Sequence, residues 1–153
     1  MDAFDCGKDP LNDFLKRRAL KNEGKASRTY VVTANTGNMA GKVVAYYSLS
    51  TGAVTHDGAP GWAKRNMPNP LPVLVLGRLA VHSDHQGKGL ASGLLREAFR
   101  RAVEAANIAG ARALIVHAID DEAIGFYTPY GFQRFPTDGR TLFLPIETIA
   151  KAL

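Results

Sequence analysis

A short glycine-containing segment, residues 86–91 (QGKGLA), has the composition of an anion-binding loop. It follows the apolar run Val73–Val81 and precedes a sequence with helical periodicity. The first amides of a helix lack partners within the helix, and the helix dipole places partial positive charge there. Glycine lets the backbone approach an anion closely, and Lys88 adds a counter-charge. The segment therefore predicts a site for a phosphate or diphosphate group.

Taken alone, this motif allows other interpretations. A Walker loop is excluded, because no Gly-Lys-Ser/Thr follows at the required distance. A dinucleotide loop would read Gly87-x-Gly89-x-x-Ser92, with serine in place of the third glycine. It should also lie near the start of a βαβ unit, whereas several expected strands precede it here. A tight strand-to-helix turn without a ligand is the remaining alternative.

Positive charge is concentrated near the start of the chain. The net charge is +5, and the segment from Lys16 to Arg28 holds six basic residues against Glu23 alone. Such a stripe attracts phosphate groups, although a solvated helix face is the alternative. Arg78 is a second notable charge, because it interrupts the apolar run that leads to the glycine loop. A charge there is costly unless it reaches solvent or a partner, such as the opposite charge of a structural ion pair.

The composition narrows the class of protein. With 153 residues, 46% hydrophobic and 22% charged, the chain fits one ordinary globular domain rather than a disordered or repeat protein. No apolar run approaches the roughly 18 residues of a membrane span, and the acidic start does not resemble a signal peptide. The single Cys6 cannot form an internal disulfide, and the four histidines lack metal-ligand spacing. We therefore expect a reducing, cytoplasmic setting, with no metal and no membrane.

The first third of the chain predicts a helix followed by antiparallel strands. Asp9 is a good N-cap and Pro10 fits the first turn, so the helix is expected to start there and to end at Gly24. Apolar runs separated by turn residues then indicate a hairpin. The expected elements are strands at Arg28–Ala34 and Lys42–Leu49, a turn at Asn35–Asn38 and a candidate third strand at Ser50–His56.

The remaining elements predict a sheet with helices packed on it. Val73–Val81 is nearly all apolar, as expected for a central strand covered on both faces. The proline-rich stretch Asp57–Pro72 is either a functional loop or a plain surface crossover. The later elements are a long helix to about Asn107, a strand at Ala113–Ala118, a short helix from Asp120 to about Tyr130, a strand pair at Phe132–Phe135 and Thr141–Leu144, and a helix at Ile146–Leu153. This order predicts a mixed α/β fold.

Two motifs together resemble one known family. Gln86-x-x-Gly89-x-Ala91 is similar to the pyrophosphate loop of the GCN5-related N-acetyltransferases (GNAT), Gln/Arg-x-x-Gly-x-Gly/Ala. Residues 123–132 (AIGFYTPYGF) resemble that family's Ala-x-x-Phe-Tyr-x-x-x-Gly-Phe, in the right order along the chain. The resemblance implies one domain over residues 1–153, a GNAT-like α/β (mixed α+β) fold. Its twisted sheet would be mostly antiparallel, with splayed central strands and helices on both faces.

Further segments are similar to the acetyltransferase toxins of type II toxin–antitoxin systems, from about Phe4 to Leu144. Among them are residues 4–7 (FDCG), 27–31 (SRTYV), 45–49 (AYYSL), 76–81 (LGRLAV) and 116–118 (VHA). This resemblance implies acetyl transfer from acetyl-CoA to the α-amino group of aminoacyl-tRNA, which blocks translation. It also implies a ribbon-helix-helix antitoxin as partner and a homodimer. Chains of this group usually begin some residues earlier, with an extra strand.

The resemblance also implies roles for single residues. Tyr127 would protonate the departing CoA sulfur as general acid, which suits a phenol with a pKa of about 10. The backbone of Leu79, Ala80 and Val81 would bind pantetheine. The other expected acetyl-CoA contacts are Gln86, Gly87, Lys88, Gly89, Leu90 and Ala91 at the pyrophosphate, together with Phe126. The expected tRNA contacts are Arg78, Arg17, Lys21, Lys25, Lys64 and Arg65.

The chemistry of the acceptor favours an α-amine. No general base stands out in the sequence, and an α-amino group titrates at about 7.7–8.0, whereas a lysine side chain titrates at about 10.4. A small-molecule or protein amine is the alternative acceptor. A catalytically idle module that binds CoA or an antitoxin is a further alternative, which the intact motifs disfavour.

Overall fold

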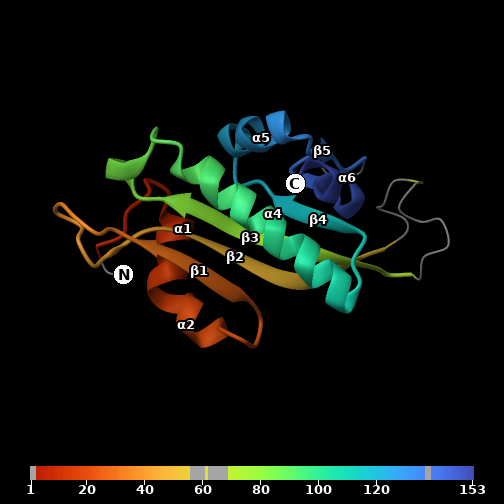
Figure 1. Cartoon of the computed structure of the whole chain (residues 1–153), viewed down its shortest axis with the longest axis horizontal. Coiled ribbons are helices and arrows are strands. Elements are labelled where there is room, and N and C mark those ends of the chain that lie inside the picture. Colours follow the sequence, from red (N-terminus) through yellow and green to blue (C-terminus); the bar gives the residue numbers. More distant parts are fainter. Residues whose placement is uncertain (1–2, 56–60, 62–68, 137–138) are drawn as a thin grey trace. The chain divides into compact units, whose positions relative to one another are not determined.

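The computed structural model describes residues 3–55, 61, 69–136 and 139–153. Lys64, Arg65 and most of the proline-rich stretch 57–72 lie outside these ranges. The described strands form one six-stranded sheet in the order β1-β2-β3-β4-β6-β5 (Figure 1). They are β1 Arg28–Thr33, β2 Val43–Val54, β3 Leu71–Val81, β4 Ala113–His117, β5 Gln133–Arg134 and β6 Thr141–Pro145. β3 and β4 are parallel, whereas β1–β2, β4–β6 and β5–β6 are antiparallel, so the predicted mixed, mostly antiparallel sheet is confirmed.

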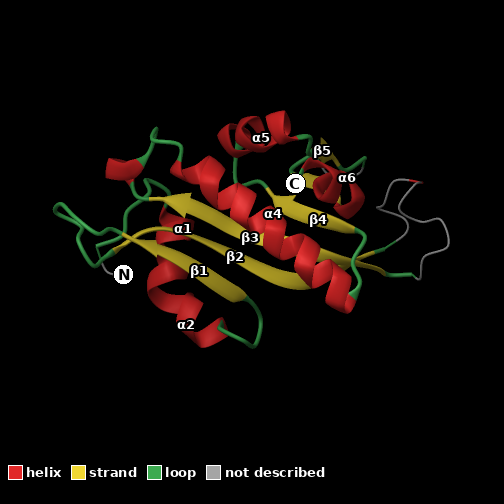
Figure 2. Ribbon diagram, viewed as in Figure 1, coloured by secondary structure: helices red, strands yellow, loops and turns green. Residues whose placement is uncertain are grey.

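The helices occur in the expected order along the chain (Figure 2). They are α1 Asp9–Asp13, η1 Phe14–Arg18, α2 Ala19–Asn22, η3 Ser83–His85, α4 Leu90–Ala109, α5 Asp121–Tyr127, η4 Thr128–Tyr130 and α6 Ile146–Ala152. None of the helices in the described ranges is long and apolar enough to cross a membrane. The chain divides into two compact units: unit 1 comprises residues 1–50 and 77–98, and unit 2 comprises residues 51–76 and 99–153.

In unit 1, the N-terminal helix differs from the prediction in two ways. Lys8, not Asp9, occupies the N-cap position, with extended backbone angles and no side-chain cap. Asp9 lies in the first turn, where its negative charge suits the helix dipole. The predicted single α-helix is also interrupted, because η1 is a five-residue π-helical turn between α1 and α2. Its Phe14 and Leu15 are both buried and belong to the same core cluster as Ala19 of α2.

The core of unit 1 is built on β2. Residues Val43–Leu49 are buried without interruption, as expected when both faces of a strand are covered. Tyr46 packs against Phe14, whereas its neighbour Tyr47 stacks on Tyr30 of β1. The candidate third strand at Ser50–His56 is wrong, since β2 continues unbroken to Val54. The polar residues after Leu49 do not force a turn.

Unit 2 contains the second half of the sheet. β3 pairs with β4 in parallel register over Leu74–Leu76, and β4 pairs with the whole of β6. The Asp120 carboxylate accepts a hydrogen bond from the Ala123 amide at 2.9 Å and so caps α5 as predicted. Gly131, with φ of 101°, ends the η4 turn that follows. The predicted closing strand pair is confirmed as β5 and β6.

Candidate functional site

The glycine loop lies in unit 1, between β3 and the long helix α4. The Gln86 side-chain amide donates hydrogen bonds to the carbonyl oxygens of Val81 at 2.9 Å and Cys6 at 3.0 Å. These bonds tie the start of the loop to the end of β3 and to the N-terminal segment. Gly87 and Gly89 have φ values of 78° and 80°, which residues with a Cβ rarely adopt. The loop therefore has the strand–glycine–helix geometry of an anion site, at the positive end of a 20-residue helix.

The end of β3 that leads to this loop extends past its pairing with β4. Within the described residues, the register between these two strands stops at Leu76, whereas β3 continues to Val81. The predicted pantetheine contacts Leu79, Ala80 and Val81 all lie in this extension. On the side of β2, the His82 amide donates to the Val44 carbonyl at 2.7 Å. This end of β3 therefore has β2 as its neighbour on one side. On the other side, its backbone continues beyond the last residue that pairs with β4.

Tyr127 lies in unit 2, at the end of α5. It is 6% exposed and packs edge-on against Phe126 and Phe132, with ring centroids 5.1 and 5.4 Å away. Burial disfavours the charged phenolate and raises the pKa of Tyr127 well above its ordinary value. The phenol therefore stays protonated at neutral pH and can act there as a proton donor but not as a base. The predicted acetyl-CoA contact Phe126 is only partly buried and also packs against Tyr130.

The predicted basic contacts from the first helix lie in unit 1 and reach solvent. Arg17 on η1, Lys21 on α2 and Lys25 in the turn that follows are all exposed. The one acidic residue of this segment, Glu23, forms an ion pair with Arg28 at 3.2 Å. Glu23 therefore pairs with a residue that is not one of the predicted tRNA contacts. Lys64 and Arg65 lie outside the described residues.

Arg78 has an aromatic partner. Its guanidinium carbon lies 3.7 Å from the centroid of the Phe14 ring, within the distance of a cation–π contact. Partial burial lowers the pKa of Arg78, and the positive charge of Arg18 lowers it further, whereas Tyr46 opposes the shift. This contact differs from the structural ion pair that the sequence left open. The sequence could not reveal it, because the two partners are far apart in the chain.

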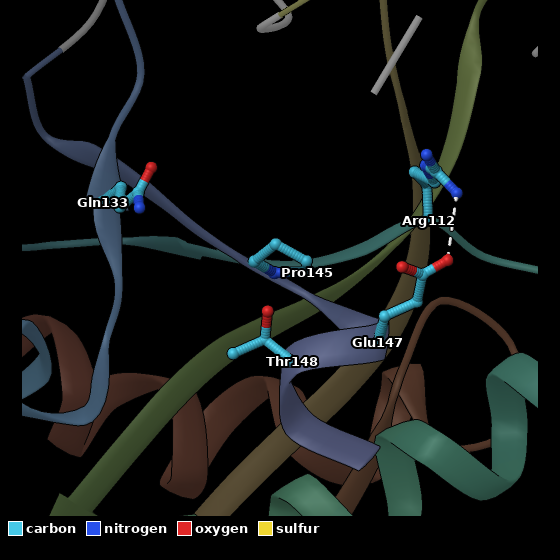
Figure 3. A pocket seen from close by; sticks show the side chains of 5 residues that line it. All are labelled: Arg112, Gln133, Pro145, Glu147 and Thr148. Carbon is cyan, nitrogen blue, oxygen red and sulfur yellow. Dashed lines mark ion pairs between the residues drawn. The ribbon is translucent and has the colours of Figure 1, made fainter. Parts of the chain in front are cut away.

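A pocket of about 350 Å³ in unit 2 was not anticipated from the sequence (Figure 3). Its lining residues are Arg112, Gln133, Pro145, Glu147 and Thr148. The Arg112 guanidinium forms an ion pair with Glu147 at 3.5 Å, so the two opposite charges offset each other. None of these residues belongs to the predicted site, and the motifs contained no signal for them.

Two further side chains of unit 1, Cys6 and His82, are buried. Cys6 is buried, and burial raises the pKa of its thiol, which makes the thiolate scarce at neutral pH. His82 is also buried, and its Nδ1 accepts a hydrogen bond from the Asp84 amide at 3.1 Å. In the part of the chain that the structure describes, no three potential metal ligands are grouped together.

Comparison with known proteins gives a consistent result. The family model for the acetyltransferase (GNAT) domain matches residues 25–134. The chain is 45% identical over 151 residues to a tRNA-acetylating toxin of Mycobacterium tuberculosis, across 99% of this chain and 88% of that protein.

Two solved structures extend the comparison. The chain is similar to AtaT complexed with acetyl-methionyl-tRNAfMet, with a TM-score of 0.84 and 29% identity over 97% of this chain and 89% of that one. It is also similar to a mutant AtaT toxin bound to acetyl-CoA and to the C-terminus of the antitoxin AtaR. There the TM-score is 0.81 and the identity 27%, over 99% of this chain and 88% of that one.

Proposed function

The chain belongs to the GNAT acetyltransferase family, and from this premise we propose that it acetylates the α-amino group of aminoacyl-tRNA and thereby blocks translation. As a family member it is an N-acetyltransferase that uses acetyl-CoA. The observation that carries the choice of acceptor is the 45% identity to a tRNA-acetylating toxin over nearly the whole chain. The family match covers parts of both units, which supports a single acetyltransferase domain over residues 1–153.

The site for acetyl-CoA is assigned to β3 and the glycine loop. The backbone amides of residues 86–91 would hold the pyrophosphate, supported by the left-handed conformations of Gly87 and Gly89 and by the charge of Lys88. The backbone of Leu79, Ala80 and Val81 would bind pantetheine, supported by the extension of β3 past its pairing with β4. Phe126 would contribute an apolar contact beside Tyr127.

The proton for the leaving group is assigned to Tyr127. Acetyl-CoA supplies a thioester; the acceptor nitrogen bonds to its carbonyl carbon and the carbon–sulfur bond breaks. Burial keeps the phenol of Tyr127 protonated, so it can give that proton to the departing sulfur. The acceptor nitrogen loses one proton when it becomes an amide, and the sulfur gains one, so the number of protons is conserved. An α-amino group has a pKa of about 7.7–8.0, and the adjacent ester lowers it further. A substantial fraction of the acceptor amine is therefore unprotonated near neutral pH, so this assignment requires no strong base.

Binding of the tRNA is assigned to the basic residues predicted as its contacts. Arg17, Lys21 and Lys25 are exposed, and the nearby Glu23 carboxylate forms its ion pair with Arg28. Arg78 lies in the same unit, on the strand that leads to the glycine loop. Lys64 and Arg65 complete the proposed set. A line of phosphates would meet these cations with a salt-dependent affinity.

The proposal extends to the partners. AtaT binds the C-terminus of its antitoxin AtaR, and we propose that a ribbon-helix-helix antitoxin neutralises this chain in the same general way. A homodimer is proposed as the enzyme's assembly, and the cytoplasm as its location, since charged tRNA and acetyl-CoA occur there.

The test is transfer of labelled acetyl from acetyl-CoA to a total pool of charged tRNA, with Tyr127→Phe as the control. Label that appears on charged tRNA and disappears in the mutant supports both the acceptor and the role of Tyr127. Absence of label with the wild-type enzyme, despite tight acetyl-CoA binding, contradicts the tRNA-directed function. It would then favour a small-molecule or protein amine as acceptor.

A further inference from the structure

The guanidinium of Arg78 lies on an aromatic support in the core of unit 1. We define this support as Phe14 and Tyr46 together with the backbone of Leu11. The Phe14 ring stacks on Tyr46 with centroids 6.0 Å apart and an angle of 23° between the rings. The Tyr46 hydroxyl donates to the Leu11 carbonyl at 2.6 Å, which ties the strand to the helix. The ring under Arg78 is therefore fixed by a stack and a hydrogen bond.

The π-helical turn determines where that ring lies. Phe14 is the first residue of η1 and is only 2% exposed. π-Helical turns inside α-helices occur frequently at functional sites. This one directs two consecutive residues, Phe14 and Leu15, into the core and leaves the next three, Lys16, Arg17 and Arg18, exposed. The same turn thus supplies both the platform for Arg78 and a run of exposed cations.

Stacking leaves the binding capacity of a guanidinium intact. The guanidinium carbon of Arg78 lies over the face of the Phe14 ring, 3.7 Å from its centroid. The N–H donors of a guanidinium lie in its plane and match the oxygens of a phosphate in a bidentate arrangement. A lysine ammonium would keep the charge but lose both the planar stack and the forked donors.

A second cation acts on the same group. Arg18 follows Phe14 by four residues in η1, a spacing that places two residues on the same side of a helix, and its side chain is exposed. In addition to the effect of burial, its positive charge lowers the pKa of Arg78, in agreement with this placement. Two interacting cations repel each other, and an anion between them removes that repulsion. The chemistry of the pair therefore matches an anionic group with several oxygens, such as a phosphate.

We infer that Arg78 and Arg18 bind a phosphate of the RNA acceptor, and that Phe14 is the positioning residue that holds the Arg78 guanidinium for this contact. This inference rests on the proposed tRNA-directed function. It adds Arg18 to the proposed contacts and gives Phe14 a role that none of the family motifs assigned to it.

The experiment compares two ring deletions from the same core cluster, Phe14→Leu and Phe4→Leu. Phe4 is fully buried and packs edge-on against Tyr46 and His82, so its loss tests core packing without removing the ring under Arg78. Acetyl transfer to charged tRNA is measured, with KM determined for each substrate. Phe14→Leu is expected to raise KM for charged tRNA by about 3- to 10-fold, as expected for loss of a partly desolvated cation–π contact. Its KM for acetyl-CoA should stay near the wild-type value, and Phe4→Leu should leave both KM values near wild type.

A double mutant distinguishes a role of Phe14 in positioning Arg78 from a role in core packing. If Phe14 acts through Arg78, Phe14→Leu should raise KM for charged tRNA no further in an Arg78→Ala background. Arg18→Ala and Arg78→Ala should each reduce the slope of log affinity for tRNA against log salt by about one. A Phe14→Leu effect that persists without Arg78, or that equals the effect of Phe4→Leu, would overturn the inference while tRNA acetylation stands. A wild-type enzyme that transfers nothing to tRNA would instead contradict the proposed function, and the inference with it.

Discussion

The side-chain amide of Gln86 lies 2.9 Å from the carbonyl oxygen of Val81 and donates a hydrogen bond to it. The same nitrogen donates to the Cys6 carbonyl at 3.0 Å. One side chain thus connects the first residue of the glycine loop to the last residue of β3. These are the two segments to which acetyl-CoA is assigned, so the geometry of one depends on the other.

Replacing Gln86 by alanine should therefore weaken acetyl-CoA binding. Each lost hydrogen bond contributes about 0.5–1.5 kcal/mol, so the dissociation constant is expected to rise by roughly 5- to 150-fold if both bonds serve to order the loop. Isothermal titration with acetyl-CoA measures this. Gln133→Ala, an exposed residue of unit 2, is the control and should bind as wild type does. Unchanged affinity in Gln86→Ala would show that the loop holds its shape without this side chain.

Gly89 in the loop and Gly93 in the helix that follows allow a matched comparison within one segment. Gly89→Ala places a Cβ at φ of 80°, which costs about 1–2 kcal/mol, and should lower both stability and acetyl-CoA affinity. Gly93→Ala lies one turn into α4, where no neighbouring atom lies within 4 Å of the added Cβ. It should be neutral or stabilise the fold by up to about 1 kcal/mol, with unchanged affinity. Equal effects of the two variants on the thermal midpoint and on the dissociation constant would contradict the conformational argument.

Tyr127→Phe should reduce kcat by about 10²- to 10⁴-fold, since general acid catalysis contributes on that scale. Acetyl-CoA affinity should stay nearly unchanged, because the ring and its contacts with Phe126 and Phe132 remain. Single-turnover rates and equilibrium binding distinguish the two effects. A mutant with wild-type turnover would remove Tyr127 from the proton-donor role.

Stability should fall at alkaline pH because of two buried tyrosines. Burial raises the pKa of both Tyr46 and Tyr127 above the value of about 10 expected in the unfolded chain. A pKa that is higher in the folded state gives a contribution that is complete below about pH 10 and is lost as the pH rises further. Urea unfolding at pH 8 to 11 measures it. Tyr127→Phe should make the decline shallower; a decline as steep as that of the wild type would assign it to other groups.

Much of the fold could be predicted because its signals are local. The apolar run of β3, the glycines at 87 and 89, the Asp120 cap and the closing strands each depend on residues close together in sequence. The π-helical turn could not be predicted in this way. Leu11, Phe14, Leu15 and Ala19 are spaced as an α-helix requires, so their periodicity did not distinguish a π turn within that helix.

The contacts that define the candidate site depend on residues distant in sequence. The Arg78 guanidinium meets Phe14, and the Gln86 amide meets Cys6, only after β3 and the N-terminal segment have packed together in unit 1. The sequence could identify Arg78 as an unusual charge in an apolar strand, but not the ring that supports it. The same holds for the pocket beside Arg112, whose lining residues come from separate elements of unit 2.

The Cys6 thiol can report on the state of the glycine loop, because the Cys6 carbonyl accepts a hydrogen bond from Gln86 at the start of that loop. Cys6 is the only cysteine of the chain, and its thiol is buried. Alkylation of that thiol requires the N-terminal segment to open, and the labelling rate therefore reads how often the segment separates from the start of the loop. A ligand that orders the loop should slow this labelling, so occupancy can be followed on the unmodified wild-type protein without an introduced probe.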